Sequence, residues 1–104
     1  MTTEIQLNTD EHGEGRYTIL VDGLPAGELD YRTIDGRRAP VHTGVRDRYE
    51  GQGLAGQLAR RALDDARAEG LKIIPLCPYV ASYLEKHPED QDLIDQEAWD
   101  RLKG

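Results

Sequence analysis

The chain has 104 residues, a hydrophobic content of 38% and a formal net charge of −7 at pH 7. This length and composition predict one folded domain, residues 1–104, that buries its own core. The acidic balance argues against general binding to DNA or RNA, which depends on Lys and Arg neutralising phosphates, and no apolar run approaches the roughly 20 residues of a membrane-spanning helix.

Alternating apolar residues predict strands in the first half of the chain. Ile5 and Leu7 indicate a short strand, and residues 17–21 indicate a clearer one. The pair Asp22-Gly23 is typical of a tight turn, and a further strand is expected over residues 28–34. A second Asp-Gly pair then precedes a strand over residues 41–45. This order predicts an antiparallel meander.

Residues 52–69 have the apolar periodicity of an amphipathic helix, and Gly70 is expected to end it. Residues 73–76 are apolar on both faces, as in a central buried strand. The connection between residues 45 and 76 is long enough for a crossover, so the strand over residues 73–76 is expected beside the strand over residues 41–45, parallel to it.

The last third of the chain is predicted to be helical. Pro78 suits the first turn of a helix that runs over residues 79–86 and ends before Pro88. The tail begins acidic, which favours a helix N-terminus. Leu93, Ile94, Ala98 and Leu102 fit a short amphipathic helix, and Trp99 is interpreted as an anchor for the tail. The elements together predict an α+β fold.

The glycine-rich residues 51–56 are the main functional signal. Small residues let a backbone approach a ligand, and a helix that begins there directs free N–H groups at it, which suits a phosphate-bearing cofactor. Eight arginines lie between residues 32 and 67, around this loop. The alternative is a purely structural turn.

The same residues match G-x-G-x-x-G, but the context of a dinucleotide site is absent. Antiparallel strands precede the loop, the strand after the helix ends without an acidic residue, and the chain is too short for a two-half dinucleotide fold. A Walker site is also excluded, because no Lys-Ser/Thr follows the glycines.

Residues 50–55 and the helix after them resemble motif A of the GNAT acyl-CoA-dependent N-acetyltransferases, which runs Gln/Arg-x-x-Gly-x-Gly/Ala. Residues 41–43 (Val-His-Thr), 74–80 (Ile-Pro-Leu-Cys-Pro-Tyr-Val) and 82–89 add a resemblance to the small, single-domain YjdJ-type branch. The similarity spans about residues 17–92.

The resemblance implies a GNAT-like α+β fold, whose mixed, mostly antiparallel sheet is splayed between its fourth strand, residues 41–45, and its fifth, residues 73–76. A crossover helix and C-terminal helices complete it. The resemblance also implies acetyl-CoA as the cofactor, with its pantetheine arm in the splay and its pyrophosphate on residues 51–56. The implied cofactor contacts are Val45, Arg46, Arg48, Gly51, Gln52, Gly53, Leu54, Ala55 and Gly56.

Arg46, Arg48 and Arg60 are predicted to reach the cofactor phosphates, and a backbone N–H near Val45 to polarise the acyl carbonyl. The sequence departs from the implied pattern at two positions. Glu50 replaces the usual Gln or Arg of motif A. Gly44 replaces an acidic residue usual in the branch after His-Thr. Long helices after the first strand, which wall the acceptor site in larger GNAT proteins, are also not expected here.

Four residues are candidates for catalysis. His42 is a candidate base because an imidazole titrates near neutral pH, with a structural, hydrogen-bonded role as the alternative. Cys77 follows a buried strand at a helix N-terminus, a position that favours a thiolate. It would carry the acyl group, line the thiol pocket, or serve only as a small buried residue. Tyr79 or Tyr83, one turn apart, would protonate the leaving thiolate, and core packing is the alternative for both.

Cys77 is the only cysteine, which excludes an internal disulfide and a cysteine-based zinc site, and no metal is expected. The N-terminus lacks the features of a signal peptide, so a cytoplasmic protein is predicted. Two functions remain open. One is transfer of an acetyl group from acetyl-CoA to an unidentified amine, which is a small molecule or a protein lysine. The other is a CoA-binding or interaction module without turnover.

Overall fold

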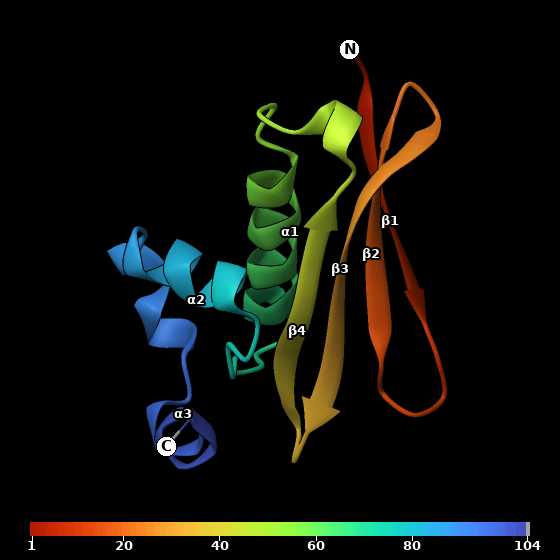
Figure 1. Cartoon of the computed structure of the whole chain (residues 1–104). Coiled ribbons are helices and arrows are strands. Elements are labelled where there is room, and N and C mark those ends of the chain that lie inside the picture. The colour runs from red at the N-terminus through yellow and green to blue at the C-terminus, as the bar shows by residue number, and fades with distance from the viewer. Residues whose placement is uncertain (104) are drawn as a thin grey trace.

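Four antiparallel strands form the sheet of the computed structural model, which describes residues 1–103 (Figure 1). They are β1 (Thr3–Thr9), β2 (Gly15–Val21), β3 (Leu24–Ile34) and β4 (Arg37–Val45), paired in chain order. The β2–β3 and β3–β4 turns each place an Asp-Gly pair at positive φ, which is the type I′ geometry that suits two-residue hairpins. The predicted antiparallel meander is confirmed.

Helix α1 (Leu54–Ala68) lies against one face of this sheet. Its buried leucines pack on Tyr17, Ile19 and Leu29, as the apolar stripe predicts. The helix begins two residues later than predicted, because Gly53 has a φ of 76° and therefore cannot join a right-handed helix.

At its other end, α1 stops at Gly70 as predicted. The Leu71 N–H donates to the Ala66 carbonyl at 2.9 Å, and the Gly70 N–H donates to the Arg67 carbonyl at 3.2 Å. This pair of bonds around a left-handed glycine, with φ of 71°, is a Schellman motif. The Asp65, Ala66 and Arg67 carbonyl groups in the last turn of α1 thus accept hydrogen bonds within the protein.

The predicted fifth strand is reduced to isolated parallel bridges. The Ile74 N–H donates to the Arg38 carbonyl at 3.0 Å, and the Cys77 N–H donates to the Pro40 carbonyl at 2.8 Å. The segment therefore lies beside β4 and parallel to it, as expected. It does not form a continuous strand because Pro75 offers no N–H, and α2 follows at once. Beyond Pro40, no strand among the described residues pairs with β4 on this side, so the two segments diverge.

A bulge interrupts the pairing of β3 with β4. Tyr31 lies opposite Pro40, but Asp30 lies opposite His42, so Val41 has no partner across the ladder. Such an extra residue changes the face of the sheet on which the following side chains lie, and the edge toward which the following N–H and C=O groups point. The bulge occurs where β4 parts from the segment after α1.

Residues 37–40 were not predicted to belong to a strand, yet β4 begins at Arg37. Consecutive arginines do not resemble a buried strand. The guanidinium of Arg38 is nevertheless covered, because it lies 4.3 Å from the centre of the Tyr31 ring and forms an ion pair with Glu69 at 3.1 Å. The strand is therefore extended by the tertiary contacts of Arg38, which no local sequence pattern predicts.

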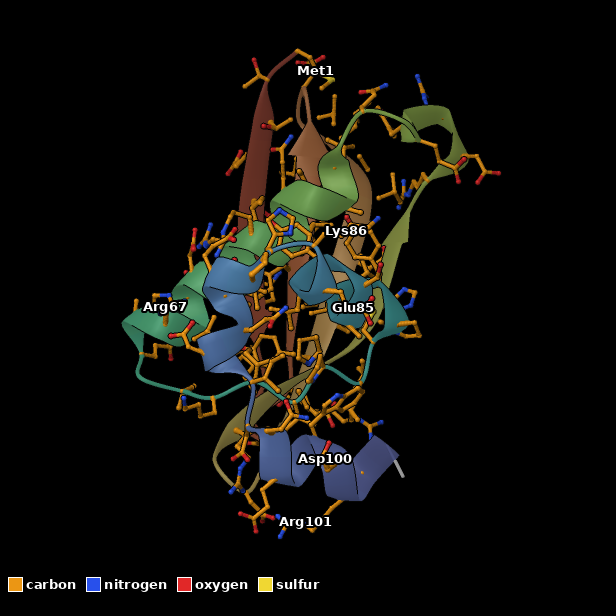
Figure 2. All side chains as sticks on the ribbon, turned by 90° about the vertical axis from the view of Figure 1, so that its left-hand side faces the viewer. Met1, Arg67, Glu85, Lys86, Asp100 and Arg101 are labelled. Carbon is orange, nitrogen blue, oxygen red and sulfur yellow. The ribbon has the colours of Figure 1, made fainter. Side chains whose placement is uncertain are left out.

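The C-terminal third contains α2 (Pro78–Glu85), a 3-10 helix η2 (Pro88–Leu93) and α3 (Gln96–Lys103). A shorter 3-10 helix, η1 (Asp47–Tyr49), follows β4. Figure 2 shows the helices in front of the strands. Trp99 packs on a small cluster of Ala39, Ile74 and Ala98, which agrees with its predicted anchoring role. Leu102 is exposed and does not join the apolar face predicted for it. No helix in residues 1–103 has the length and apolar character needed to cross a membrane.

Candidate functional site

The backbone N–H groups of residues 51–56 have no hydrogen-bond acceptor within the described part of the chain. The preceding N–H, that of Glu50, donates to the Asp47 carbonyl, and the first intrahelical bond of α1 runs from the Gln57 N–H to the Gly53 carbonyl at 3.2 Å. Gly53 is the N-cap and offers no capping side chain. The positive end of the helix dipole therefore lies beside a row of free donors, which is the usual environment of a bound anion.

Two glycines give the loop this shape. Gly51 and Gly53 have φ of 80° and 76°, a region that side chains rarely allow. A Cβ at either position would meet no other atom within 4 Å, so the space in front of them is open. The loop thus turns its backbone toward an uncovered surface.

A pocket of about 200 Å³ lies against this loop. It is lined by Val45 and Tyr49, by residues 50–56 other than Gln52, and by Tyr79. The structure therefore brings the end of β4, the start of α1 and the first turn of α2 to one place. Gln52 is exposed and lies outside this pocket.

Arg46 and Arg48 differ from the other arginines. Both are exposed, and neither has a carboxylate partner among the described residues; the guanidinium of Arg48 lies only over the Tyr49 ring, at 5.1 Å. Every other arginine is paired with an acidic side chain. These pairs are Arg16–Asp30, Arg32–Glu14, Arg37–Asp95, Arg38–Glu69, Arg60–Asp90, Arg61–Asp65, Arg67–Asp92 and Arg101–Glu97.

Arg60 lines a second hollow of about 450 Å³ that also touches Gly56 and Tyr83. Its guanidinium, however, donates to both oxygens of Asp90, at 2.6 and 2.8 Å, and to Asp64 at 3.0 Å. These bonds neutralise the charge and tie η2 to α1. The expectation that Arg60 serves a phosphate is not supported by this geometry.

Cys77 is buried and lies beside β4. Its Sγ is 3.4 Å from the Oγ1 of Thr43, and its backbone caps the start of α2. The thiol therefore sits on the α1 side of β4, close to the point where β4 and the segment after α1 diverge.

His42 lies on the other side of the strand. Its Nε2 is 2.9 Å from the Oε2 of Glu28, and half of its side chain is exposed, at 53%. His42 and Cys77, both candidates from the sequence, are thus separated by β4. Alternation along β4 would place Val41 on the face opposite His42, but the bulged Val41 lines the same hollow as Asp30 and Arg32.

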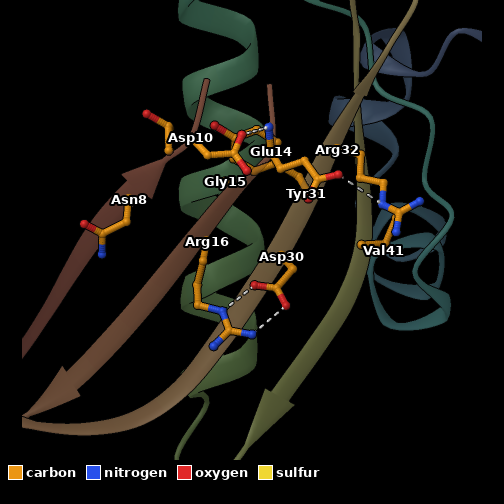
Figure 3. Close-up of a pocket in the computed structure, with 10 residues that line it drawn as sticks. Asn8, Asp10, Glu14, Gly15, Arg16, Asp30, Tyr31, Arg32 and Val41 are labelled. Carbon is orange, nitrogen blue, oxygen red and sulfur yellow. Dashed lines mark hydrogen bonds and ion pairs between the residues drawn. The ribbon is translucent and has the colours of Figure 1, made fainter. Parts of the chain in front are cut away.

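That face is turned away from α1, and we call it the open face; it carries Arg16, Glu28, Asp30, Arg32 and His42. Figure 3 views it with α1 behind the strands. A hollow of about 440 Å³ lies near its β1–β2 end. The charges there are already balanced, because Arg16 donates to both oxygens of Asp30, at 2.6 and 2.9 Å.

The two tyrosines of α2 have different surroundings. Tyr79 lines the pocket at the glycine loop, and its hydroxyl lies 3.7 Å from where a Cβ on Gly56 would be. Burial, together with the neighbouring Tyr83, raises the pKa of Tyr79, so its hydroxyl keeps its proton at neutral pH. Tyr83 stacks on the His87 ring, with centroids 3.9 Å apart, and does not line this pocket.

Comparison with known proteins identifies the family. A family model described as GCN5-related N-acetyl-transferase matches residues 16–93. The chain belongs to the GCN5-related N-acetyltransferase (GNAT) family. It is 42% identical over 87 residues to Protein NATD1 of Gallus gallus, covering 80% of this chain and 79% of that protein. The human Protein NATD1 is also 42% identical, with coverage of 80% and 77%.

Solved structures agree with the GNAT fold. A GCN5-like protein from Staphylococcus aureus, determined by NMR, superimposes with a TM-score of 0.64 at 30% identity, covering 86% of each chain. The ribosomal-protein-alanine N-acetyltransferase of Brucella melitensis biovar Abortus 2308 has a TM-score of 0.63, with coverage of 74% of this chain and 80% of that one. At 15% identity the second likeness concerns the fold alone.

Sequence reasoning about this GNAT protein overlooked Glu28, the residue bonded to His42. Glu28 and Asp30 are two residues apart on the strand that pairs with the strand of His42, and this spacing could have indicated a carboxylate partner for the histidine. Counting outward from the Asp35-Gly36 turn, however, would have placed Glu28 opposite Thr43. The bulge shifts the register by one residue and places it opposite Gly44. Tyr49 was overlooked as well, because its position in η1 has no distinctive pattern.

Proposed function

We propose that this GNAT protein binds acetyl-CoA and transfers its acetyl group to an amine. The observation that carries the proposal is the row of unbonded N–H groups at residues 51–56, which faces a pocket shared with Val45 and Tyr79. Every α-helix leaves its first N–H groups without an intrahelical partner. Here the row of unbonded N–H groups extends back to residue 51, and two glycines at positive φ leave the space in front of it open.

The residues present fit the anionic half of the ligand. Backbone donors of residues 51–56 would hold the diphosphate; Glu50 lines the same pocket, and its side chain leaves these backbone N–H groups in place. Arg46 and Arg48 have no carboxylate partner among the described residues and would add positive charge at the edge of the site.

The free edge of β4 fits the extended arm of the ligand. The Arg46 N–H donates to the Ala26 carbonyl of β3 at 2.8 Å. Because successive strand residues direct their N–H and C=O groups to opposite edges, Thr43 and Val45 direct theirs away from β3, toward the gap. An amide-containing chain could therefore pair there as an added strand would.

Bound acetyl-CoA supplies a thioester, whose acyl carbon is open to attack by a neutral amine. The Val45 N–H would donate to the acyl oxygen, and the Tyr79 hydroxyl, held protonated, would donate a proton to the departing sulfur. His42 would take the proton of the incoming amine from the open face. Cys77, on the α1 side, would line the thiol end of the channel or accept the acyl group itself.

Two measurements test the proposal. Calorimetric titration with CoA is expected to show saturable, one-to-one binding. Incubation with labelled acetyl-CoA and a panel of primary amines is then expected to label an amine. Label on Cys77 without amine transfer would indicate an acyl-enzyme whose acceptor is missing from the panel. Binding of CoA with neither label would favour a CoA-binding module, and absence of binding would contradict the site.

Two finer assignments belong to the same proposal. The connection between β1 and β2 is a short turn at residues 10–14 rather than a pair of helices, which supports the small YjdJ-type branch. A cytoplasmic location stays a prediction from the sequence.

A further inference from the structure

Gly44 lies under a carboxylate and an imidazole. Glu28 is its partner across the β3–β4 ladder. A Cβ built on Gly44 would lie 2.7 Å from the Oε2 of Glu28 and 3.2 Å from the Nε2 of His42. The two side chains therefore fold over the glycine and fill the space that a side chain at this position would take. They bond to each other there, at 2.9 Å.

From this geometry we propose that Glu28 is the positioning residue for the base of the acetyl transfer and that His42 is the base. The inference rests on the proposed function, since it concerns the acceptor side of the same site. Glu28 of β3 thereby supplies a carboxylate above Gly44, where β4 itself has no side chain.

The hydrogen bond fixes which imidazole nitrogen is available. Nε2 must donate its hydrogen to the ionised Glu28, so in the neutral ring Nδ1 carries the lone pair. No described residue bonds this Nδ1, and half of the ring is exposed on the open face. Nδ1 is therefore free to accept a proton from an amine, while the carboxylate balances the imidazolium that results.

The surrounding charges leave Glu28 as the group that serves His42. Asp30 of β3 lies opposite His42 in the ladder, but Arg16 of β2 binds both of its oxygens. On β4 itself, Gly44 contributes no charge. Arg16 and Asp30 therefore compensate each other. Arg16 also attracts Glu28 more weakly, but the hydrogen bond of the Glu28 carboxylate is with His42, so this carboxylate is placed to attract a cationic amine and to stabilise the imidazolium.

The reaction balances without another reagent. An ammonium group gives one proton to the Nδ1 of His42, and the neutral amine forms a C–N bond with the acyl carbon as the C–S bond breaks. The attacking nitrogen loses its second proton as it becomes the amide nitrogen, and the departing thiolate takes up one proton. The imidazolium releases the first proton to water. The net products are an amide, a thiol and one proton.

The first test removes the pair and measures turnover with the amine that the wild type acetylates fastest. Glu28→Gln and His42→Gln are each expected to lower kcat at least about tenfold, with the affinity for CoA unchanged within twofold. Thr18→Ala, an uncharged change on β2, is the matched control. Wild-type turnover in both variants would overturn the inference, while the proposed function would stand.

The second test moves the carboxylate to the other strand. Glu28→Ala is expected to lose activity, and Glu28→Ala with Gly44→Glu is expected to recover much of it, because the new side chain starts under the imidazole. A structural role for Glu28 would not be rescued in this way. Gly44→Glu alone crowds two carboxylates together and is expected to be less active than wild type. Failure of the double variant to recover, with its melting temperature intact, would contradict the proposal.

A spectroscopic measurement is independent of turnover. Nitrogen-15 chemical shifts of the neutral imidazole are expected to report the Nε2–H form of His42 in the wild type, and loss of this preference in Glu28→Ala. The Nδ1–H form in the wild type would overturn the inference even if acetyl transfer is observed. If CoA binds but the wild type acetylates no amine, the enzyme proposal fails and this catalytic assignment fails with it.

Discussion

The two ends of helix α1 are built in opposite ways. At the C-terminal end, a Schellman motif satisfies the carbonyl groups of Ala66 and Arg67. The carboxylates of η2 bind Arg67 in the last turn and Arg60 in the middle of the helix. At the N-terminal end, the N–H groups of residues 51–56 have no acceptor in the described chain, and Arg46 and Arg48 have no acidic partner. Backbone hydrogen bonds and arginine–carboxylate pairs are therefore formed toward the C-terminal end of α1 and are missing at its N-terminal end within the described chain. Satisfied groups thus mark where the chain stabilises itself, and unsatisfied donors mark where a ligand is expected.

The largest effect is expected from a charge placed in the open end. Gly53→Glu is expected to weaken CoA binding at least about 100-fold, roughly 2.7 kcal/mol, because its side chain enters the space before the loop with the wrong charge. Gly70→Glu is the matched control. Both glycines have positive φ and no neighbour within 4 Å of a Cβ, so both variants carry a similar backbone cost of about 1–2 kcal/mol. Calorimetry should show loss of binding only in the first; equal affinities would contradict the site.

A change in the carboxylates of η2 that bind Arg60 and Arg67 should lower the stability of the fold without weakening CoA binding. Asp90 is buried and bonded by Arg60 and Arg67, so Asp90→Ala is expected to lower the free energy of unfolding by about 2 kcal/mol. CoA affinity at the other end should change less than threefold. Denaturant unfolding and calorimetry measure the two effects, with the exposed Asp92→Ala as the milder control. A large loss of affinity in a folded Asp90 variant would break the distinction between the two ends.

The same carboxylate predicts a pH dependence. Bonds from Arg60, and less from Arg67, lower the pKa of Asp90 below its ordinary value of 3.8. A group with a lowered folded-state pKa contributes stability above its unfolded pKa and loses it as the pH falls through the folded value. Wild-type stability should therefore fall as the pH drops below about 4, and Asp90→Asn should flatten this fall. An unchanged acid limb in that variant would contradict the assignment.

A smaller effect is expected from the unpaired arginines. The double change Arg46→Gln with Arg48→Gln is expected to weaken CoA binding about tenfold, or 1.4 kcal/mol, and to reduce its dependence on salt. Arg61→Gln, whose guanidinium is held by Asp65, is the control and should change affinity less than twofold. Binding titrations at two ionic strengths compare them. Equal losses of CoA affinity in the double variant and in Arg61→Gln would show that pairing with a carboxylate does not distinguish these arginines in cofactor binding.

Loss of the Cys77 thiol is expected to affect acetyl transfer more than CoA binding. Cys77→Ala is expected to keep CoA affinity within about tenfold, roughly 1.4 kcal/mol, but to reduce acetyl transfer. Cys77→Ser retains a hydroxyl near Thr43 and separates loss of the thiol from loss of the contact. Full activity in both variants, measured with labelled acetyl-CoA, would assign Cys77 to packing.

Much of the fold follows from local patterns. The Asp-Gly turns, the apolar stripe of α1 and the stop at Gly70 each depend on residues close together in the chain, so the sequence predicts them well. The glycine loop is predictable for the same reason, because its donors come from consecutive residues. The fifth strand was predicted from its apolar residues, but Pro75 and the early start of α2 limit it to bridges.

Sequence alone determined the antiparallel meander, the crossover helix and the run of glycines at its start, because periodicity and turn chemistry act over a few residues. Only the tertiary structure decided which charges remain unpaired, since Arg60 meets Asp90 across 30 residues of chain. It also decided the partner of Gly44. One bulged residue, Val41, shifts the register between two strands and brings Glu28 over that glycine, and no local pattern encodes such a shift.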